Sequence, residues 1–266
     1  MKWAGGKRSL IERITELFPE DYRIRRYHEP FLGGGAVFFE LEPERGTIND
    51  VNPKLINFYR VVRDYPQDLI DCASKYRYEE KEYYKRRERF NDLDIPSVES
   101  AALFLYLNRT AFNGLYRENS KGEFNVPYGR YKNPKIVFRK RILETSLLFS
   151  GIEIHCKDFS YILDYVEQGD ICYLDPPYHP MSKTANFTEY ASGNFSFEDQ
   201  LRLRDICIKL NELGVFFVLS NSDTPAINDL YESTGFMKTY LKTRRSISSK
   251  PSTRNSGEEL LISNCG

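Results

Sequence analysis

The chain has 266 residues, which is enough for one large domain or for a core with an inserted subdomain. Its 38 basic and 38 acidic residues cancel, so the overall charge indicates no polyanionic partner, and any nucleic-acid contact must depend on local charge. The hydrophobic fraction of 41% is ordinary for a soluble protein, and no stretch approaches the length of a membrane span. We therefore expect a soluble protein that makes no membrane contact.

The five cysteines show no C-x-x-C pairing and no histidine at ligand spacing. An odd number of cysteines without a secretory signal favours a reducing compartment over a disulfide framework. Met1-Lys2-Trp3 is followed by glycine and charge rather than by the apolar run of a signal peptide. The sequence therefore predicts a cytoplasmic protein, without disulfides and without a metal site.

Trp3-Ala4-Gly5-Gly6-Lys7 precedes residues 10–18, whose apolar side chains recur at helical spacing and predict an amphipathic helix. The two glycines let the backbone approach a ligand closely. Lys7 lies near the start of the helix, where the helix dipole disfavours a cation, and this indicates a carboxylate partner. Taken alone, however, the stretch fits a flexible terminus with a solvated lysine better.

Residues 27–39 predict a strand, a glycine loop at Gly33-Gly34-Gly35 and a helix, and residues 46–50 predict a second strand that ends in Asp50. A glycine turn followed by an acidic residue at the end of the next strand is the geometry that binds ribose hydroxyls. The spacing matches neither the dinucleotide fingerprint nor a P-loop, which argues against a nucleotide-binding oxidoreductase. A lone histidine before a strand, His28, is interpreted as structural.

From residue 53 to residue 109 the pattern is helical, with no alternation of strands and helices. We interpret this segment as a helical subdomain that interrupts the sheet. The following residues, 108–141, interleave Arg, Lys and Asn with Tyr and Phe around Asn-Gly and Lys-Gly turns, which predicts a hairpin-like loop region. Such residues can contact phosphates, read bases and stack on them, and the local basic excess favours nucleic acid over an ordinary polar hairpin.

After this region the strand pattern resumes. Residues 153–156 predict a strand followed by Asp158 and then by a short helix through Leu163. Residues 170–174 predict a buried strand that runs into Asp175-Pro176-Pro177-Tyr178. The prolines stiffen a turn that is rich in carbonyl acceptors, Asp175 adds another acceptor, and Tyr178 offers a flat face. This combination suits an exocyclic amino group on a planar base. The turn alone does not exclude a simple strand end with an aspartate cap and a packed tyrosine.

The residues after this turn predict a loop, a helix and three further strands. Residues 179–194 predict a long mobile loop, interpreted as a lid. A capped helix over 196–213 and a buried strand over 214–222 follow, then strands near 237–241 and 259–262. The loop between the last two strands is basic, which fits either a grip on a phosphate backbone or a solvated hairpin tip. Its basic residues are Arg244, Arg245, Lys250 and Arg254.

Together these motifs resemble those of the Dam-type DNA adenine-N6 methyltransferases of the D12 class, in the α-type motif order. The resemblance spans nearly the whole chain, whereas Asp-Pro-Pro-Tyr alone would also admit RNA or glutamine methyltransferases. The matching segments are residues 2–7, 29–35, 48–50, 112–117, 124–131 and 175–178.

The resemblance implies that the chain binds S-adenosylmethionine. Lys7 would lie near the carboxylate of the cofactor, the glycine loop would wrap its methionine moiety, Asp50 would bind the ribose hydroxyls, and Asp158 with Phe159 would hold the adenine. The full set of cofactor-binding residues that the resemblance implies is Trp3, Gly6, Lys7, Phe31, Gly33, Gly35, Asp50, Asp158, Phe159 and Asp175.

The resemblance also implies catalytic and DNA-binding roles. Asp175 and the carbonyl of Pro176 would accept from the target amino group, with Pro177 in the same turn and Tyr178 stacked on a flipped-out base. Arg117 would read guanine, and Phe112 would wedge where the base was lost. The implied DNA-binding residues are Arg109, Phe112, Asn113, Leu115, Arg117, Asn125, Pro127 and Arg130.

We therefore expect an α/β, Rossmann-like methyltransferase sheet, with the catalytic domain at 1–55 and 138–266 and a helical and hairpin target-recognition domain at 56–137. The expected activity is adenine-N6 methylation of a short double-stranded DNA site, GATC, by a cytoplasmic, nucleoid-associated monomer. A cognate restriction endonuclease acting separately is a further candidate partner. The alternatives are an N4-cytosine DNA methyltransferase and an inactive DNA-binding relative.

Overall fold

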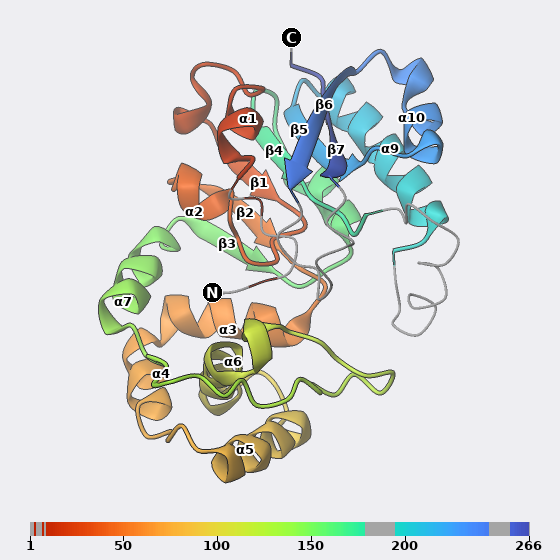
Figure 1. The fold of residues 1–266 in the computed structure, drawn as a ribbon. Coiled ribbons are helices and arrows are strands. Elements are labelled where there is room, and N and C mark those ends of the chain that lie inside the picture. Colours follow the sequence, from red (N-terminus) through yellow and green to blue (C-terminus); the bar gives the residue numbers. More distant parts are fainter. Residues whose placement is uncertain (1–2, 4–6, 8, 179–194, 245–255, 266) are drawn as a thin grey trace. The chain divides into compact units, whose positions relative to one another are not determined.

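The computed structural model describes residues 3, 7, 9–178, 195–244 and 256–265 (Figure 1). The predicted lid at 179–194, Gly6, and the predicted basic-loop residues Arg245, Lys250 and Arg254 lie outside these ranges. The chain divides into two compact units. Unit 1 comprises Met1–Arg8 and Leu32–Phe159, and unit 2 comprises Ser9–Phe31 and Ser160–Gly266.

The strands form a mixed, mostly parallel sheet in the order β3-β2-β1-β4-β5-β7-β6. The pairs β2–β3, β1–β4 and β4–β5 are parallel, and β7 pairs antiparallel with both β5 and β6. The predicted α/β class is confirmed, and the order reverses between β1 and β4, where open α/β sheets bind ligands. The strands are β1 (Tyr27–Glu29), β2 (Gly46–Asn49), β3 (Ile152–His155), β4 (Ile171–Leu174), β5 (Phe216–Ser222), β6 (Met237–Arg244) and β7 (Ser256–Ser263).

Unit 1 is built from β2, β3 and a group of helices. Figure 1 shows α3, α4, α5 and α6 gathered together, and α6 packs against each of the other three. The predicted helical character of residues 53–109 is confirmed, whereas α7 was not predicted. The helices are α2 (Phe38–Leu41), α3 (Pro53–Asp64), α4 (Pro66–Ala73), α5 (Glu80–Asp92), α6 (Val98–Thr110), the 3-10 turn η2 (Phe112–Gly114) and α7 (Arg139–Leu148).

Local chemistry explains where these helices begin. The Asn52 side chain accepts hydrogen bonds from the backbone N–H groups of Lys54 and Leu55, and Pro53 occupies the first helical position of α3. Ser97 caps α6 in the same way. Most side chains of α6 are buried, and its apolar residues are not confined to one face, so α6 is not clearly amphipathic. The predicted recognition domain, 56–137, lies wholly within unit 1, and its boundaries stay a prediction.

Unit 2 contains the strands β1, β4, β5, β6 and β7 with α9 packed against β5. Ser196 and Asp199 form the predicted cap of α9 as a reciprocal capping box. His28 is fully buried, with its Nε2 2.9 Å from a carboxylate oxygen of Asp170, as expected of a structural histidine. The helices are α1 (Ile11–Thr15), α9 (Phe197–Glu212), α10 (Pro225–Leu230) and the 3-10 turns η1 (Tyr22–Ile24), η3 (Phe159–Asp164) and η4 (Glu232–Thr234).

Two predicted elements differ from those observed. The helix expected over residues 10–18 is the short α1, although Leu10, Ile14 and Phe18 are buried as the pattern predicts. The short helix expected through Leu163 is the 3-10 turn η3. Within the described ranges, no helix is both long enough and apolar enough to cross a membrane.

Gly151, between α7 and β3, provides a test of the packing in unit 1. A Cβ atom at this position would lie 2.0 Å from the backbone oxygen of Glu44, which cannot move without displacing the chain. We expect Gly151→Ala to lower the free energy of unfolding by about 1–3 kcal/mol, measured by denaturant titration. Gly122→Asn is the control, since that position is open, and it should cost about 1 kcal/mol or less. Equal losses for the two variants would contradict the tight packing.

Candidate functional site

The carboxylate of Asp50 lies directly after β2 and is held by backbone donors. Its Oδ2 accepts from the N–H of Gly33 and its Oδ1 from the N–H of Asn52, both at 2.9 Å. The N–H of Leu32 donates to the Asn49 carbonyl at 2.8 Å, which ties the glycine loop to the end of β2. Burial raises the pKa of Asp50 above 3.8, although the two N–H groups act to lower it. The predicted pair of glycine loop and strand-end acid is therefore joined in the structure.

Trp3 packs against this glycine loop. A Cβ atom on Gly33 would lie 2.8 Å from Trp3 Nε1, and one on Gly34 would lie 2.8 Å from Trp3 Cβ, so neither position has room for a side chain. Gly33 also has a φ of 48°, which favours glycine. The Trp3 ring stacks on Tyr116, with ring centroids 5.2 Å apart. Lys7 is buried, with an exposed fraction of 8%, and this does not fit the alternative of a solvated lysine.

Asp158 and Phe159 follow the neighbouring strand, β3. Asn49 pairs in register with His155, so the ends of β2 and β3 lie at the same edge. The Asn49 side chain bonds both backbone groups of Lys157, at 2.8 and 3.0 Å, which fixes the segment before Asp158. Asp158 is exposed and Phe159 is buried. Unit 1 thus brings both strand-end acids to one edge of the sheet, and Asp50 is bonded there to the glycine loop.

The Asp175–Tyr178 turn lies in unit 2 at the end of β4, which is buried along its whole length. Asp175 and Tyr178 are half-buried, Pro176 is buried and Pro177 is exposed. The Tyr178 hydroxyl donates to the carboxylate of Glu259 on β7. Burial, followed by the charges of Asp175 and Glu259, raises the pKa of Tyr178 far above its usual value, so the hydroxyl remains a donor. The turn is therefore a fixed group of acceptors beside an oriented aromatic ring.

The predicted hairpin region is a loop that folds back on itself without a continuous ladder. Only two isolated bridges are present among its described residues, Ala111 with Tyr128 and Glu118 with Phe124. The stated bounds of 108–141 are wrong at both ends, because α6 continues through Thr110 and α7 begins at Arg139. Arg109 therefore lies in the last turn of α6.

Arg109 faces the protein. Its Nε donates to the Lys135 carbonyl at 3.1 Å, and its guanidinium lies 4.7 Å from the ring centre of Phe138. Burial lowers the pKa of Arg109. The predicted contact of Arg109 with DNA stays a prediction, but this structure already assigns the guanidinium a packing role.

The other predicted DNA-binding residues surround the tip and sides of the loop. The Phe112 side chain is 50% exposed. The Nε of Arg117 donates to Asn125 Oδ1 at 2.7 Å, and the N–H of Asn125 donates to the Arg117 carbonyl at 3.1 Å. Arg130, which is exposed, lies 3.7 Å from Glu80. Asn113 has a φ of 54°, Pro127 is exposed, and Leu115 is half-buried.

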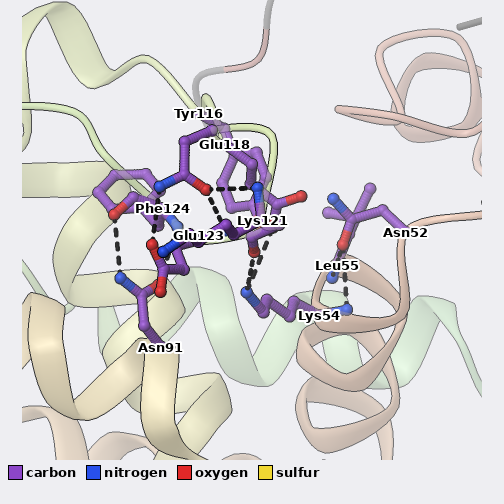
Figure 2. Close-up of polar contacts among 11 residues, drawn as sticks. Asn52, Lys54, Leu55, Asn91, Tyr116, Glu118, Lys121, Glu123 and Phe124 are labelled. Atoms are coloured by element: carbon purple, nitrogen blue, oxygen red, sulfur yellow. Dashed lines mark hydrogen bonds and ion pairs between the residues drawn. The ribbon is translucent and has the colours of Figure 1, made fainter. Parts of the chain in front are cut away.

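Sequence reasoning missed the residues that hold this loop in place (Figure 2). The Nζ of Lys54 donates to Glu118 at 3.3 Å and to the Gly122 carbonyl at 2.9 Å. The Asn91 side chain bonds both the N–H and the carbonyl of Phe124, at 2.8 and 3.1 Å. Lysine and asparagine are common on helix surfaces, and no local sequence signal distinguishes these two from their neighbours. They anchor the loop to α3 and α5.

The comparison with protein families now identifies the class of enzyme. The family model of D12 class N6 adenine-specific DNA methyltransferases matches residues 3–247. The chain belongs to this family and is a DNA adenine-N6 methyltransferase, which confirms the resemblance seen in the sequence. Membership of an adenine-specific methyltransferase family excludes the alternative of a nucleotide-binding oxidoreductase. It also argues against a cytosine-N4 methyltransferase and against an inactive DNA-binding relative.

Individual relatives align along the whole chain. It is 44% identical over 272 residues to the type II methyltransferase M1.LlaDCHI of Lactococcus lactis subsp. cremoris, covering 100% of this chain and 94% of that protein. It is 41% identical to the type II methyltransferase M.MjaIII of Methanocaldococcus jannaschii, covering 99% and 98%. It is 40% identical to a DNA adenine methylase of Vibrio cholerae, covering 98% and 94%.

The raised pKa of Asp50 predicts a pH-dependent effect on stability. A carboxyl group whose pKa is raised by folding contributes most to the free energy of unfolding below its ordinary pKa of 3.8. This contribution to stability is lost as the pH rises through the raised pKa. We expect the unfolding free energy of the wild type, relative to Asp50→Asn, to fall as the pH rises from about 3.8 through the raised pKa of Asp50. Denaturant titrations across this range measure it. Asp94→Asn, at an exposed position, controls for the loss of one carboxylate, and a difference that is constant or grows with pH would contradict the prediction.

Proposed function

We propose that this protein transfers a methyl group from S-adenosylmethionine to the N6 atom of an adenine in a short double-stranded site, GATC, after the base has left the helix. The observation that carries the proposal is the Asp175-Pro176-Pro177-Tyr178 turn, which follows a fully buried strand in a chain of the adenine-specific family. The GATC target rests on the resemblance of the loop segments 112–117 and 124–131 to Dam-type enzymes.

The residues of unit 1 fit S-adenosylmethionine. An ionised carboxylate accepts at about four lone-pair positions, and the N–H groups of Gly33 and Asn52 use one on each oxygen of Asp50. The remaining positions suit the two hydroxyls of a ribose. The absence of a Cβ at Gly33 lets the loop pack tightly between Trp3 and a ligand. When bound, S-adenosylmethionine supplies a methyl group on a positively charged sulfur.

Asp175 and the carbonyl of Pro176 act on the target amino group. The lone pair of an exocyclic adenine nitrogen is delocalised into the ring, so the nitrogen is a poor nucleophile. Two acceptors that bind its hydrogens favour a pyramidal nitrogen and localise the lone pair, and they stabilise the positive charge that develops on nitrogen as it attacks. Asp175 then accepts the proton that the methylated nitrogen loses, directly or through water.

The recognition loop acts on the DNA. Phe112 is apolar and half exposed, as expected of a side chain that fills the space of an extruded base, and Tyr178 stacks on that base. Asn125 binds the Nε of Arg117, which leaves the two terminal nitrogens as donors for guanine O6 and N7. We propose further that the enzyme works as a cytoplasmic, nucleoid-associated monomer. The type II names of two relatives favour a restriction endonuclease that acts separately on the same site.

The first test is methyl transfer itself. We incubate the protein with labelled S-adenosylmethionine and unmethylated plasmid, and then map modified bases by sequencing. N6-methyladenine confined to GATC is expected, and Asp175→Ala should lower the rate at least about a hundredfold because it removes an acceptor that acts in the transition state. Asp94→Ala is the matched control and should keep the wild-type rate. Label on cytosine, or none despite cofactor binding, would rule out the proposal, and label at another adenine motif would rule out GATC.

The guanine contact is tested with modified DNA. Replacing the guanine of the site by 7-deazaguanine removes the N7 acceptor, so the wild type should lose about tenfold or more in kcat/KM, in line with 1–3 kcal/mol for a bidentate contact. Arg117→Ala should be slower on ordinary DNA but insensitive to this replacement. Arg13→Ala, an exposed residue of α1, should behave like the wild type. If Arg117→Ala and the wild type are equally sensitive to 7-deazaguanine, Arg117 does not read N7.

A further inference from the structure

The Asp175–Tyr178 turn is short of backbone donors. Neither Pro176 nor Pro177 has an N–H, so neighbouring parts of the protein can grip this part of the turn only through its carbonyls or its side chains. The side chain of Gln200, on the first turns of α9, supplies such a grip. Its Nε2 donates to the Pro177 carbonyl at 3.2 Å, and its exposed fraction is 1%.

The orientation of Gln200 is set by a directional chain of hydrogen bonds. The N–H of Ser222 donates to Asn221 Oδ1 at 2.9 Å, and Asn221 Nδ2 donates to Gln200 Oε1 at 3.0 Å. A backbone N–H can only donate, and the Pro177 carbonyl at the other end can only accept. Both ends therefore require the same orientation of the two amides, because a flip of either one would bring acceptors face to face. Asn221 is fully buried, so water cannot replace these contacts.

A second anchor comes from the adjacent strand. Glu259 accepts from the Tyr178 hydroxyl and has an exposed fraction of 9%. In the antiparallel pair of β5 and β7, Ser222 lies opposite Glu259 and Asn221 lies opposite Leu260. One pair of strands thus supports both anchors: Asn221 acts through Gln200 on Pro177, and Glu259 acts on Tyr178.

We propose that Gln200, Asn221 and Glu259 are positioning residues that hold the Asp175–Tyr178 turn in its reactive conformation. The inference rests on the proposed catalytic function of that turn. Each residue acts through Pro177 or Tyr178, and none of the three needs to touch the methyl donor or the target nitrogen. Their loss should lower the rate of the chemical step far more than the affinity for either substrate, since catalysis is more sensitive than binding to small displacements of reacting groups.

Gln200→Met tests the amide anchor, because it keeps the length of the side chain and removes the donor. We expect the single-turnover rate of methylation, measured from preformed complexes, to fall about tenfold to a hundredfold. The dissociation constants for S-adenosylmethionine and for DNA should stay within about threefold of the wild-type values. Gln67→Met is the matched control on the exposed surface of α4 and should be indistinguishable from the wild type.

Glu259 is tested by rescue and by a double variant. Glu259→Gln keeps an oxygen that can accept from Tyr178 and should retain most of the rate, whereas Glu259→Ala should lose about tenfold or more. If Glu259 acts through the hydroxyl, adding Tyr178→Phe to Glu259→Ala should cause little further loss. Circular dichroism and the unfolding midpoint show whether each variant is folded.

The outcomes separate the two proposals. A wild-type protein that does not methylate DNA adenine would overturn the proposed function and this inference with it. An active wild type together with an equally fast Gln200→Met would overturn the inference alone. So would a rate loss in folded Gln200→Met that is explained by weaker binding of cofactor or DNA, or independent losses at positions 178 and 259.

Discussion

The organisation of unit 1 depends on the Asp50 carboxylate and its two backbone donors. One donor, Gly33, belongs to the glycine loop against which Trp3 packs, and the other, Asn52, caps α3. Burial of a charged group is unfavourable, and the raised pKa shows that the two hydrogen bonds do not fully offset this cost. A half-buried acid with a raised pKa is typical of a functional site, where the acceptor is kept for a ligand rather than optimised for stability.

The same contacts connect the candidate cofactor site to the candidate recognition loop. From Gly33 the packing continues through Trp3 to Tyr116, and from Asn52 it continues along α3 to Lys54, which binds Glu118 and Gly122. Tyr116 also donates to Glu118, at 2.6 Å, so the two routes meet at the base of the loop. Two chains of contacts therefore connect the glycine loop and Asp50 to the base of the loop proposed to read DNA.

Local sequence patterns predict the acids and the turn but not the residues that hold them. Asp50 and Asp175 each follow a short buried strand, so each lies at an end of a strand in the sheet. Asn91, Gln200 and Glu259 contact segments 33, 23 and 81 residues away, so no window of sequence contains both partners. The loop between α6 and α7 has hairpin residues at its turns, yet side chains from α3 and α5 take the place of a ladder. Arg109 was included in the predicted loop because an arginine fits the basic composition of that loop. In the structure it lies in the last turn of α6.

The glycine loop and the proline turn present opposite backbone chemistry. Gly33 offers an N–H, and that donor orients the acid that we propose accepts from a ribose. The two prolines offer only carbonyls, which suits the proposed role of the turn as an acceptor for an amino group. For the same reason, the turn cannot be held by its own N–H groups at those positions. The donor to the Pro177 carbonyl is a side-chain amide, and such an amide holds its orientation reliably when it is buried and its other end is bonded. Gln200 and Asn221 meet both conditions, which explains why two polar side chains are retained between α9 and β5 where apolar packing would otherwise be favourable.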